Sequence, residues 1–205
     1  MMATGLLAAF LIGSVPFSYM IVKFRTGKDI RTMGSGNAGA TNVFRSVGKK
    51  EGALTLAADF AKGIAAVALV SGILQDHMAV TPNVKFTLGV AAICGHVFTP
   101  FLGFKGGKGV ATGAGMALAI FPLNFALAFA MWLTLLLATQ YMSVASMIGA
   151  LTFSISLFFT LGNTGLTWAA IVAAFFIIWT HRLNISRLLR GEEGKTSLVS
   201  RQKSK

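Results

Sequence analysis

The chain of 205 residues is poor in cysteine and in charged side chains, and both shortages exclude classes of protein. Its single cysteine, Cys94, excludes a disulfide framework within the chain and a cysteine-rich metal site. Only 12% of the residues are charged, about half the share that a soluble domain uses to cover its surface. Apolar residues make up 55%, and the mean hydropathy is +0.72. Lipid rather than water is therefore expected to solvate most of the chain.

The charges that are present are mostly basic, with 18 Lys and Arg against 6 Asp and Glu and a net charge of +12. Such an excess is typical of nucleic-acid-binding modules, but those modules do not carry apolar runs long enough to cross a bilayer. We therefore predict a membrane protein without a nucleic-acid partner. The first apolar run, Leu6–Val22, has no basic region before it and no Ala-x-Ala cleavage site, so we interpret it as a retained span.

Apolar runs of roughly 20 residues predict the first membrane spans, and polar or glycine-containing breaks predict the later ones. The three early spans are Ala3–Val22, Ala53–Leu74 and Phe86–Leu102. The residues from Gly109 to Thr180 include no charged side chain, and three breaks divide them into four pieces: Pro122–Asn124, Thr139–Ser143 and Gly162–Gly165. Two of these pieces, Val110–Phe121 and Leu123–Ala138, are short for ~30 Å of hydrocarbon.

The basic residues indicate the topology, because 16 of the 18 lie in three segments: between Lys23 and Lys50, in the Lys105–Lys108 loop and after His181. The positive-inside rule makes their common face cytoplasmic. We therefore predict an all-α polytopic membrane protein of seven transmembrane helices, the two central ones short. Its N-terminus lies outside, its C-terminus is cytoplasmic, and residues 1–205 form a single domain. Five full spans with a re-entrant hairpin is the competing topology.

The first basic segment contains a glycine-rich run, Met33–Asn42, followed by Arg45. Glycines allow backbone N–H groups to converge on an anion, hydroxyl and amide side chains add donors, and an arginine adds a planar fork. The run also matches the dinucleotide pattern G-x-G-x-x-G, but that fingerprint needs a preceding strand, whereas a membrane helix precedes it here. We reject the dinucleotide interpretation and predict a phosphate-binding loop.

A second glycine-rich run, Gly95–Thr112, places Gly106 and Gly107 between Lys105 and Lys108. The ammonium groups would lie beside exposed backbone donors and the positive end of the next helix. The run is not a nucleotide-binding Walker A loop, because its glycine and lysine spacing differs. This difference disfavours an NTPase.

A third segment, His181–Glu192, would place His181 and Asn184 on one face if it is helical. Ser143 and Ser146 are expected at the same membrane depth as His181 and Asn184. Elsewhere we interpret Asp59 and Lys62 as a buried, mutually neutralising pair and expect His96 to be satisfied structurally. Most other basic residues that flank spans, the terminal Arg201, Lys203 and Lys205 included, are interpreted as topology signals and lipid anchors.

The reaction is narrowed by the motifs that are missing. The sequence has no acidic cluster on its basic loops to hold Mg²⁺, no H-E-x-x-H, no G-x-S-x-G and no credible cysteine nucleophile. We predict no metal and no cofactor. The remaining classes are a membrane transferase that binds two anionic substrates, a transporter of organic phosphates and a noncatalytic scaffold. The transferase is favoured because the phosphate-type motifs gather at one face and no internal repeat is found.

Three runs resemble the signature motifs of the bacterial acyl-phosphate-dependent glycerol-3-phosphate acyltransferases, the PlsY family: Gly34–Asn42, Gly95–Thr112 and His181–Arg187. Further similarity covers nearly the whole chain, in Gly13–Pro16, Ala58–Gly63 and Tyr141–Ser143. The chain departs from the family pattern at Thr99–Pro100, where the proline is expected one position earlier. It departs again at Gln140, where an arginine usually precedes the tyrosine.

The resemblance implies transfer of an acyl group from acyl phosphate to the 1-hydroxyl of sn-glycerol 3-phosphate, which gives lysophosphatidic acid and phosphate. This is the first acylation step of bacterial phospholipid synthesis. It also implies an active site on the cytoplasmic side of the bacterial inner membrane and coupling to an acyl-phosphate-forming enzyme. Because the sequence has no H-x4-D motif, a soluble thioester is not expected as the direct donor. The acyl chain is expected to enter laterally from lipid.

The family motifs also imply site residues. Ser35, Asn37 and His181 are expected to be catalytic, with the base left open between His181 and a substrate phosphate. The expected substrate-binding residues are Gly34, Gly36, Gly39, Thr41, Asn42, Arg45, Lys105, Gly106, Gly107, Lys108, Ser143 and Asn184.

Overall fold

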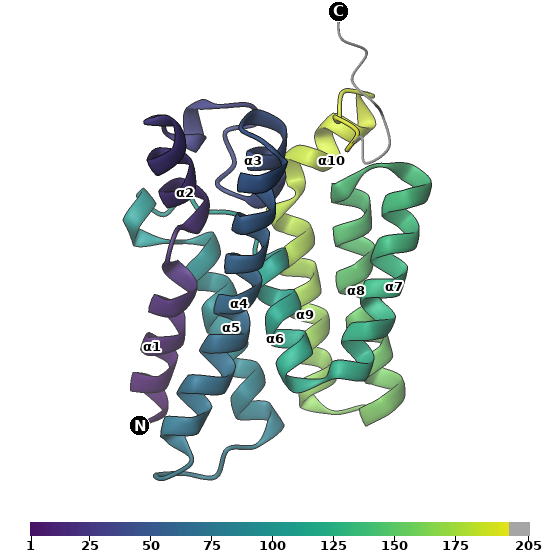
Figure 1. Cartoon of the computed structure of the whole chain (residues 1–205). Coiled ribbons are helices and arrows are strands. Elements are labelled where there is room, and N and C mark those ends of the chain that lie inside the picture. The colour runs from purple at the N-terminus through teal and green to yellow at the C-terminus, as the bar shows by residue number, and fades with distance from the viewer. Residues whose placement is uncertain (197–205) are drawn as a thin grey trace, which may run out of the picture. The chain divides into compact units, whose positions relative to one another are not determined.

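The computed structural model describes residues 1–196, and within that range it contains helices, turns and loops but no strand (Figure 1). The predicted all-α class is confirmed. Contacts between residues group the chain into two compact units, residues 1–125 and the residues from 126 onward.

The first unit holds four apolar helices and several short elements that carry the glycine-rich loops. These are α1 (Met2–Ser14), α2 (Phe17–Thr26), the 3₁₀ turn η1 (Ile30–Thr32), α3 (Ala40–Ser46), α4 (Lys49–Leu74), α5 (Pro82–Val97), the 3₁₀ turn η2 (Pro100–Leu102) and α6 (Val110–Ile120). The helix α5 begins at Pro82, where proline suits the first turn, and the hydroxyl of Thr81 accepts the N–H of Val84.

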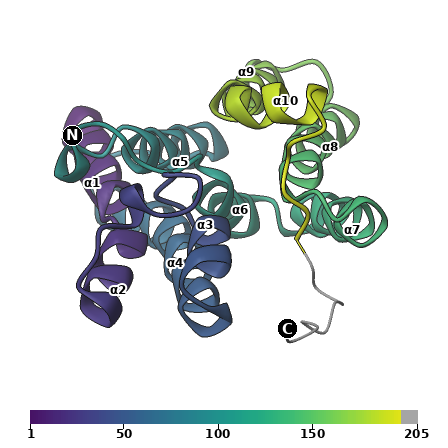
Figure 2. The same ribbon diagram turned by 90° about the horizontal axis from the view of Figure 1, so that it is seen from above.

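Glycines bring the long helices of this unit into close contact. A Cβ on Gly13 of α1 would overlap the backbone of Ala92 in α5, and a Cβ on Gly63 of α4 would overlap the carbonyl of Thr112 in α6. Lipid supplies no hydrophobic drive between membrane helices, so close backbone approach of this kind holds them together. Figure 2 shows α1, α4, α5 and α6 nearly end on, as one cluster.

The first predicted span is interrupted, because α1 ends at Ser14 and α2 begins at Phe17. Pro16 has no N–H to continue the helix, and carbonyls at the end of α1 need other donors. The Oγ1 of Thr99 donates to the Ser14 carbonyl at 2.6 Å, and the Nζ of Lys62 donates to the Val15 carbonyl at 2.9 Å. The predicted span Ala3–Val22 is confirmed as part of the apolar stretch Met2–Thr26, with a break in its helix at Val15 and Pro16.

The second unit comprises most of α7 (Pro122–Thr139), with α8 (Met142–Leu161), α9 (Gly165–Thr180) and α10 (Arg182–Leu189). The predicted breaks at Thr139–Ser143 and Gly162–Gly165 are confirmed by these helix ends, and the first break lies at Phe121, one residue before the predicted Pro122–Asn124. The start of α9 is set by a capping box, in which Thr164 and Thr167 satisfy each other's backbone N–H groups.

Among the described residues, five helices are long and apolar enough to cross a membrane, or six if the bent pair α9 and α10 counts as one span. With its 18 residues α7 is among the five, so the expectation that it is short is wrong. With 11 residues, α6 is short, as expected. The lengths support an integral membrane protein with several spans.

Candidate functional site

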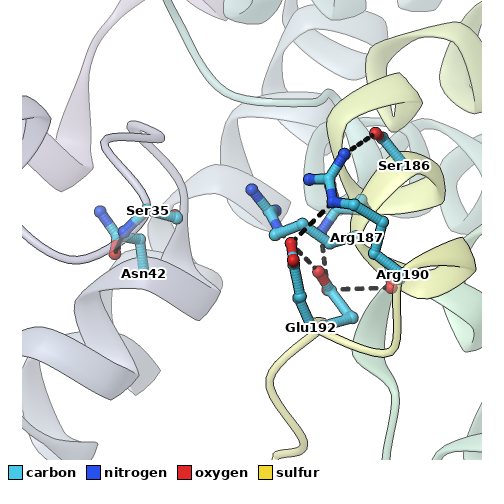
Figure 3. A network of polar contacts seen from close by, with 9 residues as sticks. Ser35, Asn42, Ser186, Arg187, Arg190 and Glu192 are labelled. Atoms are coloured by element: carbon cyan, nitrogen blue, oxygen red, sulfur yellow. Dashed lines mark hydrogen bonds and ion pairs between the residues drawn. The ribbon is translucent and has the colours of Figure 1, made fainter.

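The first glycine loop runs from η1 to α3 and is organised by Asn42, whose side chain is buried. Its Oδ1 accepts the N–H of Ser35 at 3.0 Å and the hydroxyl of Ser46 at 3.2 Å. Its Nδ2 lies within donor distance of the carbonyls of Met33, at 2.9 Å, and Asn37, at 3.0 Å. Figure 3 shows Asn42 beside Ser35. Both polar atoms of the amide hold the loop in shape.

Two glycines are required by the path of this loop, because Gly34 has a φ of 53° and Gly36 a φ of 72°. A Cβ on Gly34 would also overlap Asn42 Oδ1 and Ser46 Oγ. Ser35, between the two glycines, and Arg45, on α3, are exposed. The sequence therefore builds a tight loop that presents a serine and, nearby in the chain, a guanidinium group.

The second glycine loop, residues 103–109, folds back onto the end of α5. The N–H of Gly106 donates to the Val97 carbonyl at 3.0 Å, and the N–H of Gly107 donates to the His96 carbonyl at 3.2 Å. The expectation that these donors are exposed for an anion is wrong, because α5 already uses them. The exposed cation of this loop is Lys105, while Lys108 is half-buried.

The two glycine loops are fixed to a common framework. The Oγ of Ser18 on α2 donates to the Ala38 carbonyl of the first loop at 2.9 Å. A Cβ on Gly107 of the second loop would lie 3.0 Å from the same Ala38 oxygen. The first unit therefore brings together the two segments that carry Ser35 and Lys105.

Arg31 adds a further link between the loops, because its Nη1 donates to the Leu102 carbonyl at 3.0 Å. Asp29 orients the guanidinium with contacts of 2.7 Å to 3.1 Å. The hydrogen bonds from Arg31 hold the pKa of the Asp29 carboxyl below its usual range. The sequence gives no sign of this pair, because its role depends on a contact with Leu102, a residue far along the chain.

In the second unit, His181 lies at the 58° bend between α9 and α10 and is buried. Its Nδ1 is 2.8 Å from the Ile177 carbonyl. Because a carbonyl only accepts, Nδ1 carries the hydrogen, and the lone pair of a neutral ring is then at Nε2. Asn184, on the next turn, is also buried, and α10 shows that the segment after His181 is helical, the condition on which the shared face of His181 and Asn184 depended.

Glu193, which sequence analysis missed, ties the predicted residues of this unit together. Its side chain is 3% exposed and accepts hydrogen bonds from Ser143 Oγ at 3.1 Å, Asn184 Nδ2 at 2.7 Å and Arg187 Nε at 2.9 Å. Burial alone would raise the pKa of Glu193, but these three hydrogen bonds, that from Arg187 foremost, hold it below its usual range. One of two adjacent acids after a basic helix is a weak sequence signal.

The neighbouring carboxylate, Glu192, behaves differently. It pairs with Arg190 at 2.8 Å, and both side chains are more than half exposed. Figure 3 shows this pair together with the contact between Arg190 and Ser186. Exposed pairs of this kind contribute little stability. Within residues 1–196 no group of three His, Cys, Asp or Glu side chains is arranged to hold a metal ion.

Comparison with known proteins gives concordant matches over nearly the whole chain. A family model described as glycerol-3-phosphate acyltransferase matches residues 3–191. A protein of that name from Desulforamulus reducens is 40% identical over 190 residues, which cover 93% of this chain and 92% of the relative. One from Neisseria meningitidis serogroup C is 38% identical over 187 residues, which cover 91% and 93%.

Two solved structures are also similar, both of PlsY, described as an integral membrane glycerol 3-phosphate acyltransferase. The glycerol 3-phosphate form superposes with a TM-score of 0.85 at 37% identity and covers 95% of this chain and 94% of that one. The lysophosphatidic acid form superposes with a TM-score of 0.81 at 35% identity and the same coverage.

Proposed function

The chain belongs to the glycerol-3-phosphate acyltransferase family, and on that premise we propose that it transfers a fatty acyl group from acyl phosphate to the 1-hydroxyl of sn-glycerol 3-phosphate. The products are lysophosphatidic acid and inorganic phosphate. The observation that carries the proposal is the family match over residues 3–191, which spans the two glycine loops and the His181 segment. The similar PlsY structures are described with a glycerol 3-phosphate form and a lysophosphatidic acid form, an acceptor and a product of this reaction.

An acyl phosphate makes modest demands on the protein. It is a mixed anhydride, so the bond from its carbonyl carbon to the phosphate oxygen breaks readily as the new bond to the glycerol oxygen forms. The protein must align hydroxyl and carbonyl and offset the repulsion between two phosphates. We assign the acyl-phosphate phosphate to the Ser35–Asn42 loop, with Ser35 and Asn37 acting on the carbonyl.

Glycerol 3-phosphate is assigned to the remaining polar and basic groups. In this assignment Arg45 and Lys105 meet its phosphate, while Ser143, His181 and Asn184 orient its glycerol part. The hydroxyl proton passes either to Nε2 of His181 or to a phosphate oxygen of a substrate. The contact of His181 Nδ1 with the Ile177 carbonyl supports the first route, because it leaves the basic nitrogen at Nε2.

The topology proposal follows from the basic residues. We propose seven passes, with the N-terminus outside and both glycine loops and the His181 segment on the cytoplasmic side of the inner membrane. In this arrangement α6 is a short pass, the fourth of the seven in chain order, and residues 1–205 work as a single domain. Acyl phosphate then comes from an acyl-phosphate-forming enzyme on the same side.

The proposed reaction is tested with the purified full chain, palmitoyl phosphate and glycerol 3-phosphate. We expect equal amounts of phosphate and lysophosphatidic acid, and no product when palmitoyl-CoA replaces palmitoyl phosphate. Lys105→Ala and Arg45→Ala should each raise KM for glycerol 3-phosphate by roughly tenfold or more, because each removes a charge-assisted contact. The matched control is Lys85→Ala, at the other end of α5 from the Lys105 loop.

Two outcomes contradict these assignments. Phosphate release that does not depend on glycerol 3-phosphate would make the protein a phosphatase, and unchanged kinetics in both variants would remove Arg45 and Lys105 from the site. His181→Gln separates the proton routes. A variant that keeps a substantial rate with an unshifted pH–rate profile eliminates the histidine base.

A further inference from the structure

A cluster of three ionisable side chains lies inside the first unit, beneath the second glycine loop. The Nζ of Lys62 is 2.8 Å from Oδ1 of Asp59, and both side chains are 3% exposed, which confirms the predicted buried pair. The Nδ1 of His96 on α5 lies 3.6 Å from the same Oδ1, and His96 is also buried. His96 thus joins the pair, a contact that the sequence did not predict.

Stability alone does not account for this cluster. Moving charges out of water costs several kcal/mol per ion, and a buried ion pair is often no more stable than a well-packed apolar pair of similar volume. Moreover, Oδ1 of Asp59 has no partner with hydrogen-bond geometry among the described residues. The contacts at this oxygen are therefore electrostatic, and they act on the orientation of Lys62 and His96.

Lys62 and His96, the two partners of Asp59, each contact a backbone segment that leads to the candidate site. Lys62 donates to the Val15 carbonyl at the break between α1 and α2. His96 holds the second glycine loop twice, because its carbonyl accepts the N–H of Gly107 and its ring packs so closely on Gly107 that a Cβ there would overlap Nε2. The orientation of this ring therefore sets the position of Gly107, two residues from Lys105.

The cluster also faces the first glycine loop. A small pocket is lined by Asp59, Lys62 and His96 together with Ala38, Gly106 and Gly107. The close contact of the cluster is with the second loop, between His96 and Gly107, whereas the first loop is held at Ala38 by Ser18.

We propose that Asp59 is a positioning residue for the acceptor site. Its carboxylate, neutralised by Lys62, orients the His96 ring, and the ring supports Gly107 so that Lys105 meets the phosphate of glycerol 3-phosphate. This inference rests on the proposed function. Disturbing the cluster acts on the binding of glycerol 3-phosphate much more than on that of acyl phosphate.

The test uses the full chain and a charge-balanced pair of substitutions, Asp59→Asn with Lys62→Met, which leaves no unpaired buried charge. We expect a folded protein in which KM for glycerol 3-phosphate rises roughly tenfold to a hundredfold, while KM for palmitoyl phosphate changes less than about twofold. His96→Asn leaves the Asp59–Lys62 pair intact, removes the ring from Gly107 and should show the same selective rise. The matched control is Gly72→Ala, on α4 with open space around it.

A double-mutant cycle identifies the route of the effect. If Asp59 acts through Lys105, adding the Asp59–Lys62 substitutions to Lys105→Ala raises KM for glycerol 3-phosphate by much less than in the wild-type background. Three results would each overturn the inference. The first is that the substitutions multiply KM for glycerol 3-phosphate by the same factor in the Lys105→Ala and wild-type backgrounds. The second is an equal rise of KM for both substrates, and the third is a wild-type KM in the folded variants. Failure of the proposed function is a different result, because the wild-type chain would then make no lysophosphatidic acid.

Discussion

At the scale of single residues, two buried side chains each hold polar groups of their own unit in place: Asn42 in the first glycine loop and Glu193 after α10. Asn42 stands within a recognisable motif, so its importance was predicted, although the structure shows its amide engaged with the loop itself. Glu193 contacts Ser143, a residue 50 positions earlier. No local pattern reports such a contact, because it depends on how the chain returns after α10.

Asn42→Ala should destabilise the first glycine loop. The substitution leaves the Ser35 N–H and buried carbonyls without their partner, at a cost of about 1–3 kcal/mol. We expect a lower thermal midpoint and a loss of more than about tenfold in kcat/KM, measured by thermal unfolding and by lysophosphatidic acid formation. Asn83→Ala, an exposed position at the start of α5, is the control. Equal behaviour of the two variants would contradict the scaffold role of Asn42.

The stability of the protein should depend on pH through the carboxyl group of Glu193. Its pKa is lower in the folded chain than in the unfolded chain, so its contribution is present above the unfolded value of about 4.3. The contribution is lost as the pH falls through the folded value. The thermal midpoint of the wild-type protein should therefore drop between about pH 5 and pH 3 more steeply than that of Glu193→Gln. Parallel curves for the two proteins would show that the carboxylate charge does not stabilise the fold.

At the scale of elements, local signals located helix ends well where turn residues stand alone between apolar runs. The breaks near Pro122 and Gly162 were predicted for this reason and are confirmed. The break at Pro16 was missed, because the apolar run continues through it and hydropathy alone does not register the lost N–H. The structure shows how that break is tolerated, since Thr99 and Lys62 supply the missing donors.

Two glycines of α4 should respond oppositely to alanine. A Cβ on Gly63 would overlap the Thr112 carbonyl and force α4 and α6 apart, whereas a Cβ on Gly72 meets nothing within 4 Å. We expect Gly63→Ala to destabilise the protein by about 1–3 kcal/mol. Gly72→Ala should be neutral or stabilising by up to ~1 kcal/mol. Unfolding in detergent measures both, and equal stability of the two variants would contradict the close α4–α6 contact.

At the scale of the whole molecule, the basic residues predict that loops at opposite helix ends differ in accessibility from outside the cell. In a Cys94→Ala background, Asp76→Cys, between α4 and α5, should react with a membrane-impermeant maleimide in intact cells. Lys28→Cys, after α2, should react only once the membrane is opened. Both positions are exposed in the structure. The reverse labelling pattern would invert the proposed topology, and labelling of both in intact cells would reject it.

The sequence by itself determined that lipid solvates the chain, that it is helical and which three segments carry the family's motifs. These properties depend on composition and on short spacings, which are local. Only the tertiary structure decided that α5 uses the N–H groups of Gly106 and Gly107, and that the His96 ring lies beside Asp59. These contacts join residues far apart in the chain, so they exist only once the chain has folded and no local spacing predicts them.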